Sequence, residues 1–252
     1  MKSINKIILG NVKTIFETTY FKMSLILMLV LSIYGGYLSA GFNYLEGFIS
    51  ILSFPIFFTF GVLIPFLVIT FCTCSYFDKN EYLIMRLCSR KEYLKILIMT
   101  VFFVNLFVYI IMLIIIIIAL NLFPKAGMGF KFNVSLNCHN FIYLLFIIIR
   151  LFCIIQNISI FNTLLCKIIN SKIVIGINMI LYASFIAFSY LNVDKISNIL
   201  NIPLYIGNYL IISKYENFFI EFGCTGIYIL MLILVNYLLS IFVKKKLGDI
   251  NI

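Results

Sequence analysis

Few residues in this chain have types and spacings that could support chemistry. Cys72 and Cys74 are two positions apart and Cys88 follows them, which could begin a metal site. No histidine or second close cysteine pair completes the four ligands that a structural zinc ion takes. We therefore interpret these thiols as small apolar side chains and predict no metal site.

Catalytic and nucleotide-binding motifs are missing from the sequence. There is no G-x-x-x-x-G-K-[ST] phosphate loop, and the single histidine, His139, excludes an H-E-x-x-H metalloprotease. All nine acidic residues are predicted in loops or at helix ends, which argues against coupling to a proton or sodium gradient through a buried acid. We predict that the chain is not an enzyme and binds no cofactor itself. The nine acids are Glu17, Glu46, Asp78, Glu81, Glu92, Asp194, Glu216, Glu221 and Asp249.

The densest group of charges lies in residues 85–95, MRLCSRKEYLK, where five of eleven residues are charged although only 11% of the chain is. Asp78 followed by Glu81, and Ser89 followed by Glu92, are helix-start signatures. Together they predict a short helix over residues 79–88, about 15 Å long, before a longer one. A stiff, charged helix of this kind suits the docking of a partner, but an ordinary basic membrane loop has the same composition.

One basic residue falls inside an apolar run. Arg150 lies about 13 Å into a predicted span over 141–166, at a depth where a cation costs about 2.5 kcal/mol or more. Asn157 follows seven residues later on the same helix face. This face could border a wet cavity in which Arg150 meets an acidic group of a cargo. The structural alternative is a salt bridge to an outer acid such as Glu46, or snorkelling toward headgroups.

The elements that carry these residues are predicted to be membrane-spanning helices. The chain is 63% hydrophobic, against about half in ordinary globular proteins, and runs of about 20 apolar residues span a bilayer as helices. The unbroken apolar run over 114–118 argues against a β-barrel. We predict an all-α membrane protein with a single transmembrane domain over 1–252. Its six spans are placed near 23–42, 48–75, 95–123, 141–166, 173–191 and 225–243.

The distribution of Lys and Arg predicts the orientation. With the N-terminus inside, fourteen basic residues lie on the inner side and four on the outer side, so both termini are predicted to be cytoplasmic. The net charge of +10 then fits contact with anionic lipid headgroups rather than with nucleic acid.

Two further segments complete the predicted layout. Residues 1–22 have apolar positions at helical spacing and are predicted to form one amphipathic helix along the membrane interface. The alternative, a signal peptide cleaved after Ala40, would need an unusually long n-region. Residues 193–224 are too polar for a span and too apolar for a free loop, so we predict re-entrant or interfacial half-helices on the outer face.

Small residues recur every four positions in two spans and predict close helix packing. Such a stripe could face a second copy of the chain or a neighbouring helix of the same copy. The first span carries Ser32, Gly36 and Ala40, and the fifth carries Ala183 and Ala187.

The predicted layout resembles that of the ABC-2 type permease family. It shares with that family six spans, an amphipathic N-terminal helix, a charged helix after the second span and a long outer segment before the last span. The stretch RLCSRKEYLK, residues 86–95, is similar to the one after the second span in small Firmicute exporters, including permeases of phenol-soluble modulin exporters. The resemblance implies that the short helix is a coupling helix held by a separate ATPase subunit, which binds ATP and Mg²⁺. The residues that would face this partner are Asp78, Glu81, Arg86, Arg90 and Lys91.

In that family the first and fifth spans line the seam of a permease dimer, so the two small-residue stripes are expected at a homodimer seam or substrate path. The resemblance thus predicts the permease subunit of an ABC exporter in a bacterial plasma membrane, with an amphipathic, cytolytic or antimicrobial peptide as cargo. The alternative is a stand-alone immunity or sensor protein that binds a peptide in the membrane and needs no ATPase.

Overall fold

The computed structural model describes residues 2–54, 56–80, 90–127, 132–133, 138–190 and 218–249. These residues are almost entirely helical, as predicted, apart from one antiparallel pair of two-residue strands in which Phe132 lies opposite His139. The elements are α1 (Lys2–Glu17), α2 (Thr19–Leu38), α3 (Tyr44–Ser53), η1 (Phe57–Leu63), α4 (Ile64–Lys79), α6 (Arg90–Asn121), β1 (Phe132–Asn133), β2 (Cys138–His139), α7 (Asn140–Cys166), α8 (Ser171–Tyr190) and α11 (Phe218–Asp249).

Within the described part of the chain, five helical stretches are long and apolar enough to cross a membrane. Of α8, the part whose side chains are described, Ser171–Ser184, is a shorter apolar helix. The five stretches are Thr19–Leu38, Phe57–Lys79, Glu92–Asn121, Phe141–Cys166 and Phe218–Lys245.

The N-terminal helix, predicted over 1–22, ends at Glu17, and the helix of the first span, predicted near 23–42, already begins at Thr19. The chain bends at Thr18, whose extended backbone caps α2 and whose hydroxyl accepts a hydrogen bond from the Phe21 N–H at 3.3 Å. The apolar stripe of α1 is confirmed as one face, but Ile8, Val12 and Ile15 are buried against the bundle. The face predicted to lie on lipid is therefore covered by the protein itself.

The predicted second span, 48–75, is interrupted. Phe54 ends α3 in an extended conformation (φ −68°, ψ 115°), as expected for a residue that precedes a proline. The helix then resumes as the π-helix η1, in which the Ile64 N–H donates to the Thr59 carbonyl five residues earlier. Pro65 has no N–H for the preceding turn and its ring would collide with the carbonyl of Gly61, which favours the wider turn.

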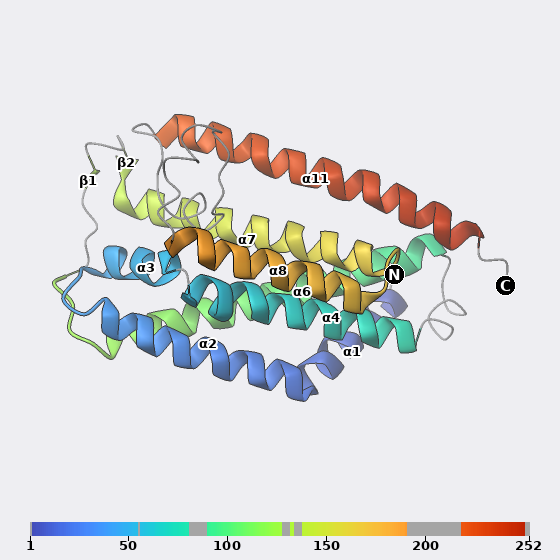
Figure 1. Cartoon of the computed structure of the whole chain (residues 1–252), viewed down its shortest axis with the longest axis horizontal. Helices are drawn as coiled ribbons and strands as arrows, with labels where there is room; N and C mark the ends of the chain where they lie inside the picture. Colours follow the sequence, from blue (N-terminus) through green and yellow to red (C-terminus); the bar gives the residue numbers. More distant parts are fainter. Residues whose placement is uncertain are drawn as a thin grey trace.

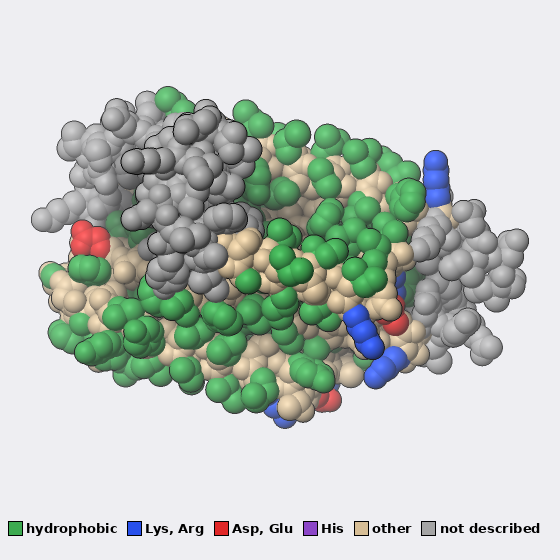
Figure 2. Space-filling model, in the orientation of Figure 1, with side chains coloured by type: hydrophobic (Ala, Val, Ile, Leu, Met, Phe, Trp, Pro, Cys, Tyr) green, Lys and Arg blue, Asp and Glu red, His purple; other side chains and the backbone are tan. Residues whose placement is uncertain are grey.

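The long helices run back and forth, so the chain alternates between two ends of the bundle (Figure 1). One end holds the C-terminal ends of α4, α7 and α11 and the N-terminal ends of α6 and α8. Exposed Lys side chains gather toward this end in Figure 2, and we refer to it as the basic end. The described exposed lysines of α1, α2, α4, α6, α8 and α11 are Lys13, Lys22, Lys79, Lys95, Lys172, Lys244 and Lys245.

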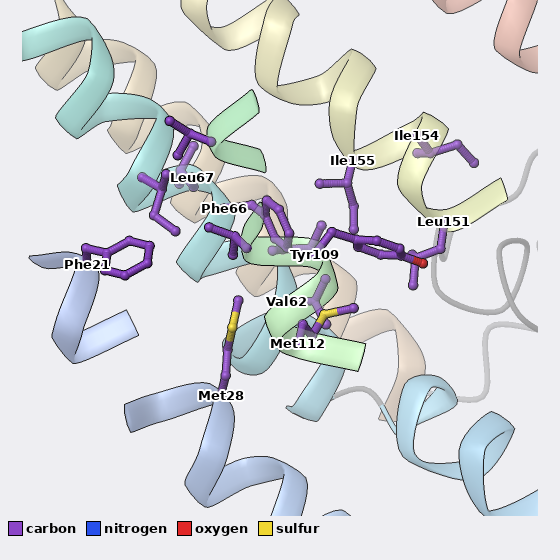
Figure 3. Packing of buried hydrophobic residues seen from close by; sticks show 14 of the residues in the cluster. Phe21, Met28, Val62, Phe66, Leu67, Tyr109, Met112, Leu151, Ile154 and Ile155 are labelled. Carbon is purple, nitrogen blue, oxygen red and sulfur yellow. The ribbon is translucent and has the colours of Figure 1, made fainter. Parts of the chain in front are cut away.

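The core and the flanks of the bundle are both apolar. Figure 3 shows part of the buried cluster, in which Phe66 and Leu67 of α4 pack with Tyr109 of α6 and Ile155 of α7. Large apolar side chains also cover the sides of the molecule (Figure 2). A soluble protein rarely exposes so much contiguous apolar surface, whereas lipid solvates it.

Candidate functional site

The most deeply buried charges form an ion pair between α7 and α11. Arg150 Nη1 lies 2.5 Å from Glu221 Oε1, and the two side chains are only 3% and 4% exposed. The Arg150 guanidinium also lies 5.1 Å from the centre of the Phe146 ring. The buried arginine was expected from the sequence, but its partner was not.

The position of Glu221 corrects two predictions. The acid was assigned to an outer segment ending at 224, but α11 already begins at Phe218 and places Glu221 in its first turn, buried. The prediction that no acid is buried among the spans is therefore wrong. Of the two roles weighed for Arg150, the structure shows the salt bridge, made with Glu221 rather than with Glu46, which is exposed.

Buried amides connect α7 to three neighbouring helices. Asn236 of α11 donates through Nδ2 to both the backbone and the side-chain oxygen of Asn157, each at 3.0 Å. Asn162 and Asn178 of α8 exchange hydrogen bonds of 3.3 and 3.0 Å. Asn105 of α6 donates to Gln156 Oε1 at 3.0 Å. Of these α7 residues, only Asn157 was singled out in the sequence, and it contacts α11 rather than an open cavity.

These polar contacts help to hold α11. Only 11% of the most apolar stretch of α11 is buried, against 72% for Phe57–Lys79. Its buried residues are Glu221, Thr225, Asn236 and Val243, three of them polar. Because lipid is as apolar as leucine, such a helix is held by close packing together with hydrogen bonds and ion pairs. Phe218, Ile229 and Leu232 of α11 supply part of that packing.

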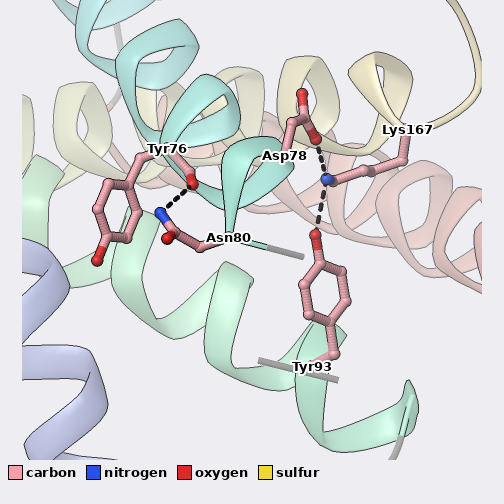
Figure 4. A network of polar contacts seen from close by, with 5 residues as sticks. All are labelled: Tyr76, Asp78, Asn80, Tyr93 and Lys167. Carbon is pink, nitrogen blue, oxygen red and sulfur yellow. Dashed lines mark hydrogen bonds and ion pairs between the residues drawn. The ribbon is translucent and has the colours of Figure 1, made fainter. Parts of the chain in front are cut away.

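A second polar cluster lies at the basic end. Lys167, at the C-terminal cap of α7, donates to Asp78 of α4 and, at 2.7 Å, to the hydroxyl of Tyr93 in α6 (Figure 4). We call these three residues the helix-end clamp. Burial alone would lower the pKa of Lys167, but Tyr93 and Asp78 outweigh it and raise that pKa above its ordinary value.

The helix-end clamp changes the interpretation of Asp78. The sequence predicted that Asp78 would cap a new short helix, but α4 continues through Lys79 and Asn80 is its C-cap. Asp78 pairs with Lys167 of the same chain, and its side chain remains 49% exposed. Glu81 and Arg86 lie outside the described residues. Arg90 and Lys91 begin α6, but their side chains are likewise not described.

The small-residue stripe of the first span packs inside the molecule. Ser32 and Gly36 are buried, and a Cβ on Gly36 would lie 2.6 Å from the Ala119 carbonyl oxygen of α6. Gly36 therefore packs closely on α6 of the same chain, whereas a role of the stripe at a dimer seam stays a prediction. Ala40 is exposed just after α2, Ala183 is exposed on α8, and the Ala187 side chain is not described.

Two signals in the sequence could have revealed the missed partners. Phenylalanines flank Glu221 on both sides, which marks an acid inside an apolar helix rather than in a loop. Lys167 directly follows the predicted fourth span, opposite Asp78 at the end of the second.

His139 proves to be the N-cap of α7, where Nδ1 accepts from the Phe141 N–H at 3.2 Å.

Within the described residues, no three His, Cys, Asp or Glu side chains come together as metal ligands. The geometry of the candidate site therefore consists of the buried α7 contacts and the helix-end clamp. Comparison of the chain with protein-family models, with curated proteins and with solved structures gives no match.

Proposed function

We propose that this chain is the membrane-spanning permease subunit of an ATP-driven exporter of the ABC-2 type. A separate ATPase subunit, which binds ATP and Mg²⁺, docks at the basic end, and two copies of the permease form the path. Both termini are cytoplasmic, and the membrane is the bacterial plasma membrane. The cargo is an amphipathic peptide, a choice that rests on the sequence resemblance alone.

The observation that carries this proposal is the helix-end clamp. Asp78 lies in the last turn of α4, Tyr93 in the first turn of α6, and Lys167 is the C-cap of α7. The ammonium group of Lys167 bonds both of the other side chains. The segment between α4 and α6 is the one that resembles a coupling helix. A force applied to that segment would therefore reach three helices at once.

The energy source follows from the sequence. The chain has no phosphate loop, and nearly all of its described residues belong to helices of the bundle. A transporter of this kind takes its energy from another chain, and the basic end offers the place for that chain to bind.

The test is purification of the tagged chain from its native membrane in mild detergent. We expect an ATP-hydrolysing subunit to be isolated with it, and the double reversal Arg86→Glu and Arg90→Glu to release that subunit. The matched control is Lys244→Glu with Lys245→Glu, which makes the same charge change at the same end. A wild-type chain that is isolated without an ATPase, or a reversed variant that retains it, contradicts the proposal.

A second candidate function is supported by the buried Glu221. Acids buried among spans are the usual means of coupling to an ion gradient, and this chain has one. A carrier of this type would acidify proteoliposomes that contain the chain alone when an inward proton gradient is imposed, and Glu221→Gln would abolish the signal. The permease of an ATP-driven exporter, reconstituted alone, would give no proton signal, so Glu221→Gln would change nothing in this assay. A stand-alone immunity protein would lack both the ATPase and the proton signal.

A further inference from the structure

A small cavity lies where η1 and α4 meet α7 and α8. Its volume is about 10 Å³, and its apolar lining includes Phe66, Leu67 and Ile155, which Figure 3 shows in one packed cluster. The polar part of its lining consists of Ser159, Asn162 and Tyr182. The cavity is therefore mainly apolar, with three polar side chains on the side formed by α7 and α8.

The three polar side chains are deeply buried. Ser159 and Asn162 are 3% exposed and Tyr182 is 5% exposed. Apolar cavities stay empty, whereas a cavity that offers two to four polar partners and about 10–15 Å³ holds a water molecule. This cavity is large enough for one water molecule. Three of the side chains that line it can form a hydrogen bond with that water.

The lining also excludes an ion. Among the described residues that line it, none carries a carboxylate or a cationic group. A cation such as Na⁺ or Ca²⁺ needs several oxygen ligands, usually with a carboxylate among them. A neutral ligand that both donates and accepts hydrogen bonds is the chemistry that fits.

We propose that this cavity is a binding site for one water molecule that bridges α7 and α8. The water completes the contact made beside it by the reciprocal pair of Asn162 and Asn178. It lies against Leu63, the last residue of the π-helix. At this residue the wide π-helical turn that precedes Pro65 gives way to regular α-helix. The site is independent of the transport proposal.

Radiolytic footprinting of the purified chain tests this site. A short X-ray pulse makes hydroxyl radicals from water, and in ¹⁸O-labelled water these mark a buried side chain only where water lies beside it. We expect Tyr182 to be marked severalfold faster than Tyr143, which is equally buried at 5% exposure. Ser159→Val removes one partner and fills the cavity, so the rate at Tyr182 should fall to that of Tyr143.

A second variant keeps the test decisive if Ser159→Val does not fold. Ser159→Thr retains the hydroxyl and adds one methyl group to the cavity, so it should also displace the water and slow the marking of Tyr182. Equal rates at Tyr182 and Tyr143 in the wild-type chain overturn the proposal. So does a rate at Tyr182 that stays high in the folded variants, because the water would then lie elsewhere.

Discussion

Arg150 and Glu221 show why removing one member of a buried ion pair costs more free energy than removing both. Each charge loses its hydration among apolar side chains, and the pair is tolerated because the two compensate each other. Removing one partner leaves the other charge buried alone, whereas removing both leaves only apolar packing. The same reasoning assigns Arg150 a structural role first, since its guanidinium already has an acid of its own chain.

This asymmetry leads to a prediction for Glu221. In Glu221→Gln the buried arginine loses its counter-charge, so the free energy of unfolding should fall by about 3–5 kcal/mol. Equilibrium unfolding in mixed detergent micelles measures the change. Replacing both Arg150 and Glu221 by Met should recover most of the loss.

The control is Glu46→Gln, which makes the same chemical change at an exposed position. It should alter stability by no more than about 0.5 kcal/mol. If Glu221→Gln proves as stable as the control, the pair does not hold α11 and its role must be sought elsewhere.

At the scale of elements, hydrophobic runs predicted where most helices lie. The spans over 141–166 and 95–123 match α7 and α6 within a few residues, because long apolar runs leave the backbone no alternative in lipid. The errors arose at local backbone features. The cap at Thr18 moved the boundary between the first two predicted helices, and the extended residue Phe54 before Pro55 divided the predicted second span.

The candidate site was less predictable than the fold. Glu221 was assigned to the outer half-helices because the whole segment 193–224 was judged by its average polarity. The small-residue stripe at Ser32 and Gly36 showed that close packing occurs, but its partner α6 is chosen by tertiary structure. The spacing within one helix cannot distinguish a neighbour in the same chain from a second copy.

The helix-end clamp leads to an element-scale prediction based on unequal burial. The Lys167 side chain is 5% exposed and that of Asp78 is 49% exposed. Asp78→Asn leaves a buried ammonium without its counter-charge and should lower the free energy of unfolding by about 1–3 kcal/mol. Lys167→Met leaves a carboxylate that water still hydrates, so it should cost less. Lys172→Met, at an exposed position nearby, is the control.

The pH dependence of the clamp has a definite sign. Because the folded pKa of Lys167 is raised above its ordinary 10.5, its contribution is complete below that pH and is lost as pH rises through the folded value. The stability difference between wild type and Lys167→Met should therefore be constant near neutral pH and change only above about 10.5. A change near pH 7 would contradict this assignment.

At the scale of the whole molecule, the ends of the bundle differ in charge. Lys172 lies in the first turn of α8 and Lys245 near the C-terminal end of α11, and both of these helix ends lie at the basic end (Figure 1). Lys125 instead donates to the Ser39 carbonyl at 2.7 Å, beside the turn that follows α2. Basic residues stay on the cytoplasmic side of a membrane. The distribution of lysines therefore supports a cytoplasmic position for the basic end. This argument requires that each of the long helices, α8 included, crosses the bilayer.

The crossing by α8 decides that condition, because its described apolar stretch, Ser171–Ser184, is shorter than the five others. Six crossings return Lys245 to the side of Lys172, whereas five would place it on the side of Lys125. Single cysteines at these three positions, in a chain whose seven native cysteines are replaced, can be labelled with a membrane-impermeant maleimide. In right-side-out vesicles we expect labelling at position 125 alone, with 172 and 245 labelled only after permeabilisation. Labelling of 245 together with 125 would mean that α8 does not cross, and the six-span topology would be wrong.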